Sequence, residues 1–324
     1  MGRSFLIALV LAGFGGEPPD GQLVLGVIGS GPERAIVADP RTGAMAQRRL
    51  SGGTLCHGPL LAVGDRLVFS GSRGRRPVAR TLPLDLSGPA RSLGYADTFT
   101  RSASAGRLWL GRWPRPKRGV LRWTNRPIPV ALTEVDSSGR ATARKRDLVP
   151  RFGSLHAETA GGFVGTFGRW LTLRRPGERP LVRVRDGWFV AAGASRAAWC
   201  RGDCAALHVW RPGGQRLLRP PAGVRPVQRE GAFSPDQRHL ATGVTVGGRS
   251  RVAVIDVSTG RWTLVPGGRL GGYQALAWSP SGRWLYFTTS NKGLRAWRFG
   301  APRAVSLPVR AGGTVMSIAT APDD

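Results

Sequence analysis

The sequence predicts an all-β protein in which one small unit of structure is repeated along the chain. Two segments near the C-terminus are nearly the same: residues 232–241 read AFSPDQRHLA and residues 277–286 read AWSPSGRWLY. Ser234 and Ser279 lie 45 residues apart, which is the length of one four-stranded blade of a β-propeller. Apolar residues come in short, β-branched runs between turn residues, without helical periodicity. We therefore predict a β-propeller.

The four strands of one blade are clearest at residues 229–268. A Ser-Pro-Asp turn at 234–236 joins the first two strands, since proline and aspartate suit the central positions of a tight turn. A glycine pair at 247–248 joins the second and third strands, and a Val-Ser-Thr-Gly turn at 257–260 joins the third and fourth. This pattern predicts an antiparallel sheet of four strands connected in sequence order.

Seven such blades of about 42 residues fit between residues 23 and 319. We place them at 23–55, 58–95, 98–148, 152–185, 187–222, 229–268 and 271–310. Six or eight blades are the alternatives, because the third segment is long and the middle of the chain is irregular. Residues 313–319 then form a leftover strand, which we expect to complete the first blade and close the ring without an open sheet edge.

The turns resemble those of the TolB-like and WD-repeat propeller families, whose blades carry Ser-Pro-Asp-Gly and Asp-x-x-Thr-Gly turns. The first turn is similar at Ser234 and Ser279, and the second is similar at Asp39, at Asp256 and, one residue shorter, at Asp136. The sequence departs from the pattern where Gln237 replaces the turn glycine, and the Gly-His and Trp-Asp pairs of WD repeats are missing. The strong resemblance covers residues 229–310 and implies a propeller fold.

Residues 1–16 predict a secretory signal peptide ahead of the propeller at 23–319. Arg3 precedes an uncharged apolar run at 5–14, which is too short to span a bilayer and ends in a small-x-small cleavage pattern at Gly13 and Gly15. Phe14 stands where a lipoprotein would carry its lipidated cysteine, which excludes that anchor. The alternative is that residues 5–12 form an ordinary buried strand.

The cysteines, like the predicted signal peptide, favour a location outside the cytoplasm. Cys200 and Cys204 enclose a three-residue loop between two apolar strands, which predicts a disulfide that persists in an oxidising environment. Free thiols, or a zinc site with His208 and His239, are the alternatives. We therefore expect a secreted or cell-envelope protein; a cytoplasmic scaffold is the alternative to export.

The chain is strongly basic, with 48 Lys and Arg against 19 Asp and Glu and a net charge of +29. Such a surplus attracts anionic partners, which here means cell-wall polymers, membrane surfaces or nucleic acid. A GC-rich genome would also favour arginine, so base composition is the alternative explanation. Arginine is spread over the whole chain rather than gathered in one tail, which disfavours nucleic acid.

The candidate binding residues lie in the loops of one face of the disc. Turns between the first and second strands and between the third and fourth strands lie on one face, which we call the turn face. Loops between the second and third strands and connections to the next blade lie on the other, which we call the loop face. We predict an anion site on the loop face, with Trp113 as a stacking surface, because guanidinium groups bind carboxylate and phosphate with paired hydrogen bonds. The predicted residues are Arg73, Arg75, Arg76, Arg112, Trp113, Arg115, Lys117, Arg118, Arg201 and Arg249. Ordinary solvated loops are the alternative.

Enzymatic motifs are missing from the sequence. It contains no Gly-x-Ser-x-Gly elbow, no phosphate-binding Gly-x-x-x-x-Gly-Lys and no His-Glu-x-x-His. His57, His156, His208 and His239 fall in different predicted blades. We therefore expect a non-catalytic, monomeric binding or scaffold module for an unidentified protein or an anionic polymer, without cofactor, metal or transmembrane segment. The alternative is a lyase or hydrolase that uses the central channel.

Overall fold

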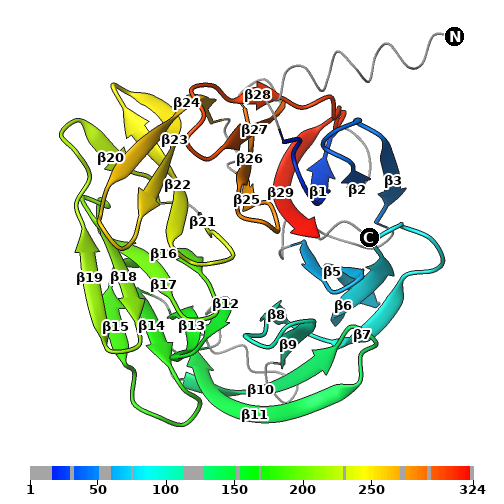
Figure 1. Ribbon diagram of the computed structural model, residues 1–324. Coiled ribbons are helices and arrows are strands. Elements are labelled where there is room, and N and C mark those ends of the chain that lie inside the picture. Colours follow the sequence, from blue (N-terminus) through cyan, green and yellow to red (C-terminus); the bar gives the residue numbers. More distant parts are fainter. Residues whose placement is uncertain are drawn as a thin grey trace, which may run out of the picture.

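The computed structural model shows seven antiparallel sheets arranged as blades around a central axis (Figure 1). It describes residues 17–29, 33–50, 60–73, 76–112, 127–150, 154–167, 169–228, 231–270, 275–289 and 293–321. The chain is all-β, as predicted, and every sheet contacts the next one around the ring. The number of blades is seven, so the alternatives of six and eight are wrong.

The first three blades follow the predicted order. The first contains β29 (Thr314–Ala321), β1 (Gln22–Ile28), β2 (Arg34–Ala38) and β3 (Met45–Arg49). The second contains β4 (Leu61–Val63), β5 (Arg66–Arg73), β6 (Arg76–Pro83) and β7 (Arg91–Tyr95). The third contains β8 (Thr98–Arg101), β9 (Arg107–Arg112), β10 (Pro127–Asp136) and β11 (Ala141–Pro150).

The remaining four blades complete the ring. The fourth contains β12 (Ser154–Thr159), β13 (Gly162–Phe167), β14 (Trp170–Arg174) and β15 (Val182–Arg185). The fifth contains β16 (Gly187–Ala192), β17 (Ala197–Arg201), β18 (Leu207–Arg211) and β19 (Gly214–Leu218). The sixth contains β20 (Val224–Pro226), β21 (Ala232–Phe233), β22 (His239–Val246), β23 (Arg249–Asp256) and β24 (Trp262–Arg269). The seventh contains β25 (Leu276–Trp278), β26 (Trp284–Thr288), β27 (Leu294–Arg298) and β28 (Val305–Ser306).

The ring is closed by the two ends of the chain. In Figure 1 the red strand β29 lies beside the dark blue β1, and the two pair antiparallel with Leu25 opposite Ile318. The predicted leftover strand therefore does complete the first blade. Because β29 occupies the inner edge of that sheet, the backbone groups of β1 are paired on both sides.

The inner position of the sixth blade differs from the prediction. Two short strands share it: β20 pairs with residues 244–246 of β22, and β21 pairs with Leu240 and Ala241 at the other end. Residues 224–226 therefore belong to the sixth blade, which the prediction began at residue 229. The strand pattern was hidden because β20 is three residues long and ends in a proline, which cannot continue a hydrogen-bonded ladder.

Hydrophobic clusters fill the space between neighbouring blades. Leu25 and Ile36 of the first blade pack with Trp284 and Tyr286 of the seventh, and all four side chains are buried. Equivalent clusters join the other neighbouring pairs of blades. Burying one large aliphatic or aromatic side chain stabilises the fold by about 1.5–3 kcal/mol, so these interfaces hold the ring together.

Aspartates order the turns between third and fourth strands, as the resemblance implied. The Asp256 carboxylate accepts hydrogen bonds from the backbone N–H of Ser258 at 2.8 Å and of Thr259 at 2.9 Å. These bonds, led by one from the Ser258 hydroxyl, lower the pKa of Asp256 to about 2. Asp39 and Asp136 cap the equivalent turns in the first and third blades.

The turn between the first two strands is built differently in the sixth and seventh blades. In the sixth, Ser234 Oγ donates to Asp236 at 2.6 Å. In the seventh, serine replaces that aspartate, and Asp20 from the other end of the chain accepts instead from Ser281 N at 3.0 Å and Ser281 Oγ at 2.8 Å. The segment before β1 is therefore fastened to the seventh blade.

Gln237 has the left-handed backbone conformation that glycine usually supplies. Its φ is 58°, where the equivalent Gly282 has a φ of 74°, and a non-glycine residue is strained there by roughly 1–2 kcal/mol. The Gln237 side chain offsets this cost by accepting a hydrogen bond from Ser195 N at 2.9 Å. The departure from the family pattern thus creates a contact between the fifth and sixth blades.

Candidate functional site

The two faces of the disc differ in their carboxylates. Most described acidic residues lie at turn-face positions, where several of them cap turns: Glu17, Asp20, Asp39, Asp65, Asp85, Asp136, Glu158, Glu178, Asp236 and Asp256. At loop-face positions the acidic residues of the described ranges are Glu33, Asp97, Asp147, Asp186 and Asp203. The acids of this basic chain are therefore concentrated on the turn face. On the loop face, Asp203 lies two residues from Arg201, and Asp186 pairs with Arg169 and Arg185.

Two of the predicted anion-binding residues meet at Tyr95, between the second and third blades. The Arg76 guanidinium lies over the Tyr95 ring, 5.2 Å from its centroid. Arg112, from the next blade, donates from Nε to the Tyr95 carbonyl oxygen at 2.6 Å. Both arginines are exposed at the loop-face ends of their strands. The structure thus brings together two cations that are 36 residues apart in the sequence.

The other predicted residues divide into two sets. Arg201 and Arg249 are exposed on the loop face, in the fifth and sixth blades. In Figure 1 these two blades lie on the other side of the ring from the second blade, which contains Arg76. Arg73 ends β5, but its side chain is outside the described part. Outside the described residues altogether are Arg75, Trp113, Arg115, Lys117 and Arg118. Their loops begin at the strands that end in Arg73 and Arg112.

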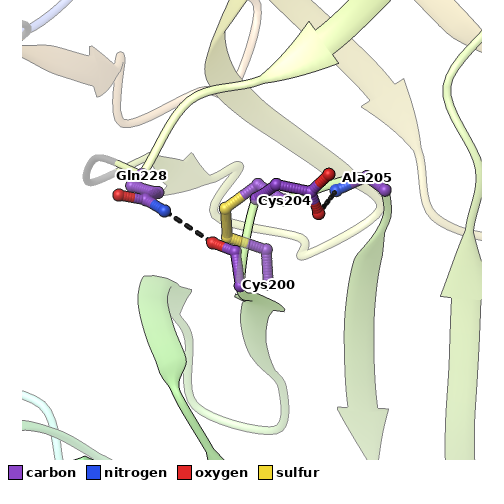
Figure 2. The surroundings of a disulfide bond; sticks show 6 residues. Cys200, Cys204, Ala205 and Gln228 are labelled. Carbon is purple, nitrogen blue, oxygen red and sulfur yellow. Dashed lines mark hydrogen bonds between the residues drawn. A yellow bond between two sulfur atoms is a disulfide. The ribbon is translucent and has the colours of Figure 1, made fainter.

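The predicted disulfide is present in the structure. Cys200 and Cys204 are bonded through their sulfur atoms, and their Cα atoms are 4.9 Å apart. Figure 2 shows the loop that they close, with Gln228 donating from Nε2 to the Gly202 carbonyl oxygen at 2.5 Å. Both cysteines are fully buried. The disulfide closes the hairpin between β17 and β18, and the Gln228 hydrogen bond ties this hairpin to the segment between β20 and β21 of the sixth blade.

The described histidines lie in contacts between aromatic rings. The His156 ring stacks on Phe189 at 4.4 Å, and burial lowers the pKa of His156 to about 4, so the ring is neutral near pH 7. His208 stacks on Trp199, and His239 packs against Phe299. His57 lies outside the described residues. Within the described ranges, no three His, Cys, Asp or Glu side chains are grouped as metal ligands.

A network of hydrogen bonds between partly buried side chains joins the third and fourth blades. No local sequence motif predicts this network. The Ser102 hydroxyl lies 2.6 Å from the Glu134 carboxylate and 3.0 Å from that of Glu158. The same Glu158 oxygen accepts from Trp109 Nε1 at 2.6 Å. Burial raises the pKa of Glu134, but hydrogen bonds from Ser102, Thr142 and Arg107 outweigh it and hold the pKa below its ordinary value. The Glu134 carboxylate is therefore a fixed and charged acceptor.

A pocket of about 520 Å³ opens beside this network on the turn face. It is lined by Lys145, Glu158, Thr159, Ala160, Gly162, Phe163, Arg175, Pro176 and Glu178. The Lys145 ammonium lies 4.8 Å from the centre of the buried Trp109 ring and 3.5 Å from Glu158 Oε1. One sequence signal could have pointed here: the chain has few glutamates, and Glu134, Glu158 and Glu178 all come from its third and fourth blades.

The ring of seven antiparallel sheets, six with four strands and the sixth with five, is closed by the last strand of the chain and defines a seven-bladed β-propeller. No family model and no curated protein matches the sequence. Among solved structures, TolB from Acinetobacter baumannii is similar over 99% of this chain and 72% of that chain, with 16% identity and a TM-score of 0.53. The periplasmic gluconolactonase PpgL from Pseudomonas aeruginosa is similar over 94% of this chain and 99% of that chain, with 17% identity and a TM-score of 0.56.

A third similar structure is described by a different ring topology from the closed ring of this chain. The β-propeller domain of the Trilobed protease from Pyrococcus furiosus, described as having an open velcro topology, matches 90% of this chain and 94% of that chain with 10% identity and a TM-score of 0.57. These likenesses show the fold alone. They agree with the TolB-like resemblance of the turns, whereas the likeness to WD repeats stays a prediction. No helix of membrane-spanning length and apolarity occurs in the part of the chain that the structure describes.

Proposed function

We propose that this propeller is an exported, non-catalytic binding module that captures an anionic polymer or protein on its loop face. The observation that carries the proposal is the meeting of Arg76 and Arg112 at Tyr95. Guanidinium groups from two blades are held there by a ring and a carbonyl oxygen. This contact uses Arg112 Nε and does not itself occupy the other N–H groups of the two arginines. The net charge of +29 adds long-range attraction for the same class of partner.

The restraint of the two side chains matters for affinity. A free arginine loses up to about 2 kcal/mol of rotamer entropy when a ligand immobilises it. The contacts with Tyr95 restrict Arg76 and Arg112 before binding, so less of this entropy remains to be lost. The proposal also includes Arg75, Trp113, Arg115, Lys117 and Arg118, which are close to Arg76 and Arg112 in the sequence and lie outside the described residues.

The experiment compares the loop face with the turn face at constant charge. One variant replaces Arg112, Arg115, Lys117 and Arg118 with serine, and the control replaces four exposed turn-face arginines, Arg140, Arg211, Arg261 and Arg303. Binding of labelled polyglutamate and polyphosphate is measured over a range of salt concentrations. We expect the loop-face variant to lose at least tenfold more affinity than the control. Equal losses would show that only net charge matters and would defeat the proposal.

Export is tested separately. The apolar run at residues 5–14 and the bonded pair Cys200 and Cys204 support it, and so does the likeness to a periplasmic propeller. N-terminal sequencing of the mature protein should find a terminus near Gly16. A mature chain that begins at Met1 or Gly2 would count against export.

A further inference from the structure

The pocket on the turn face is lined by equal numbers of cations and carboxylates, whereas a site for a polyanion would be lined mainly by cations. Lys145 and Arg175 contribute two cations to its lining, and Glu158 and Glu178 contribute two carboxylates. Phe163 and Pro176 supply apolar surface in the same wall. In a chain with a net charge of +29, such a neutral and partly apolar pocket is a different environment from the loop face.

Lys145 is held in place by the protein and still faces the pocket. Its ammonium lies over Trp109 and within 5.7 Å of the centre of the Phe163 ring, which adds cation–π attraction to the contact with Glu158. An ammonium has three N–H donors, and Glu158 is its one carboxylate partner among the described residues. The remaining donors are available to an anionic group in the pocket.

Arg175 and Glu178 stand at the two ends of one turn. The turn is fixed by the hydrogen bond from Glu178 N to the Arg175 carbonyl oxygen at 3.1 Å, with Gly177 at a φ of 79°. Both side chains are exposed and line the pocket. Within the described residues neither takes part in an ion pair, so a cation and a carboxylate are both presented to a ligand at the rim.

Glu158 can act only as a fixed acceptor at the back of the site. One of its oxygens accepts from Trp109 Nε1, Ser102 Oγ and Ala103 N. The other oxygen faces Lys145. Glu178 is therefore the carboxylate that is free to pair with a ligand cation, and Glu158 keeps the Lys145 ammonium in position.

We propose that this pocket binds a small zwitterion, namely an unblocked amino acid or short peptide. Lys145 and Arg175 take the ligand carboxylate, Glu178 takes its ammonium, and Phe163 and Pro176 contact its apolar side chain. The volume of about 520 Å³ falls in the usual range for small-molecule sites. The site lies on the opposite face from the proposed anion site and does not depend on it.

Isothermal titration calorimetry with trialanine tests the proposal, with N-acetyl-trialanine and trialanine amide as the blocked forms. We expect trialanine to bind and each blocked form to bind at least tenfold more weakly. Arg175→Gln should weaken trialanine binding but leave the binding of the amide unchanged. Glu178→Gln should weaken trialanine binding but leave the binding of the N-acetyl form unchanged.

The control is Arg303→Gln, which removes an exposed arginine from the equivalent turn of the seventh blade. It should leave trialanine binding unchanged, and melting temperatures confirm that all three exposed substitutions leave the fold intact. The proposal is overturned by an absence of trialanine binding at millimolar concentration. Equal binding of the N-acetyl form, or an equal loss in Arg303→Gln, would overturn it too.

Discussion

Replacing Asp20 with alanine should weaken the junction between the first and seventh blades. The Asp20 carboxylate accepts two hydrogen bonds from Ser281, at 3.0 Å from its N–H and 2.8 Å from its hydroxyl. A hydrogen bond to a charged group contributes about 1.5–3 kcal/mol when buried, and these two are exposed, so we take about half that value for each. The expected loss in the free energy of unfolding is therefore about 1.5–3 kcal/mol for the two bonds together. The Tyr286 hydroxyl bond to the Asp20 carbonyl oxygen does not involve the side chain and should survive.

Urea denaturation followed by tryptophan fluorescence measures this loss, with the m-value as a check that the cooperative unit is unchanged. The sixth blade suggests a rescue, because Asp236 supplies there the carboxylate that Ser281 lacks. In the Asp20→Ala background, Ser281→Asp should restore about 1 kcal/mol. In the wild type the same change should destabilise, since it places a second carboxylate beside Asp20. An Asp20→Ala effect below about 0.5 kcal/mol, or the same sign for Ser281→Asp in both backgrounds, would refute the reasoning.

Three further changes test other parts of the ring. Asp256→Asn should lower the free energy of unfolding by about 1 kcal/mol at pH 7, after allowance for solvent screening. Because the folded-state pKa of Asp256 is lowered to about 2, this loss should persist above the unfolded-state pKa near 3.8 and should fade as the pH falls toward 2. Urea denaturation of the wild type and the variant at pH 7 and at pH 2 measures it. Reduction of the bond between Cys200 and Cys204 should lower the stability by about 2 kcal/mol on the chain-entropy model for so short a loop, while a double alanine variant should not respond to reductant. Leu25→Ala, at a fully buried position, should cost about 2–5 kcal/mol, and Leu217→Ala, at a position 42% exposed, should cost under about 0.5 kcal/mol in the same assay.

The architecture was predictable because the turns are local and repeat. The turn residues of the sixth blade are contiguous in the sequence, and so are those of the capped turns at Asp39 and Asp256. The inner strand of the sixth blade was misplaced because it is split into β20 and β21, too short to show a period. Closure by β29 was also predictable, since residues 313–319 were left over after seven blades.

The pocket was not predicted, because its residues are far apart in the sequence and only the uneven distribution of glutamates pointed to the third and fourth blades. Lys145 is on the outermost strand of one blade and Glu158 on the innermost strand of the next, and each looks like an isolated charge in the sequence. Arg175 lies on a third part of the chain, the turn between β14 and β15. Only the packing of the third blade against the fourth brings them together, so no spacing rule reveals the site. Arg76 and Arg112 were named from their loops, but their common partner Tyr95 was not.

Pairing between β1 and β29 also constrains how the chain matures on the ribosome. The first blade begins to emerge early, yet Leu25 finds its partner Ile318 only after the rest of the ring has been translated. At about 5–20 residues per second this delay lasts roughly 15–60 s. During that interval the edge of β1 and the apolar side chains of Leu23, Leu25 and Val27 have no permanent cover. We therefore expect chaperones to bind the nascent propeller until its final strand has been translated.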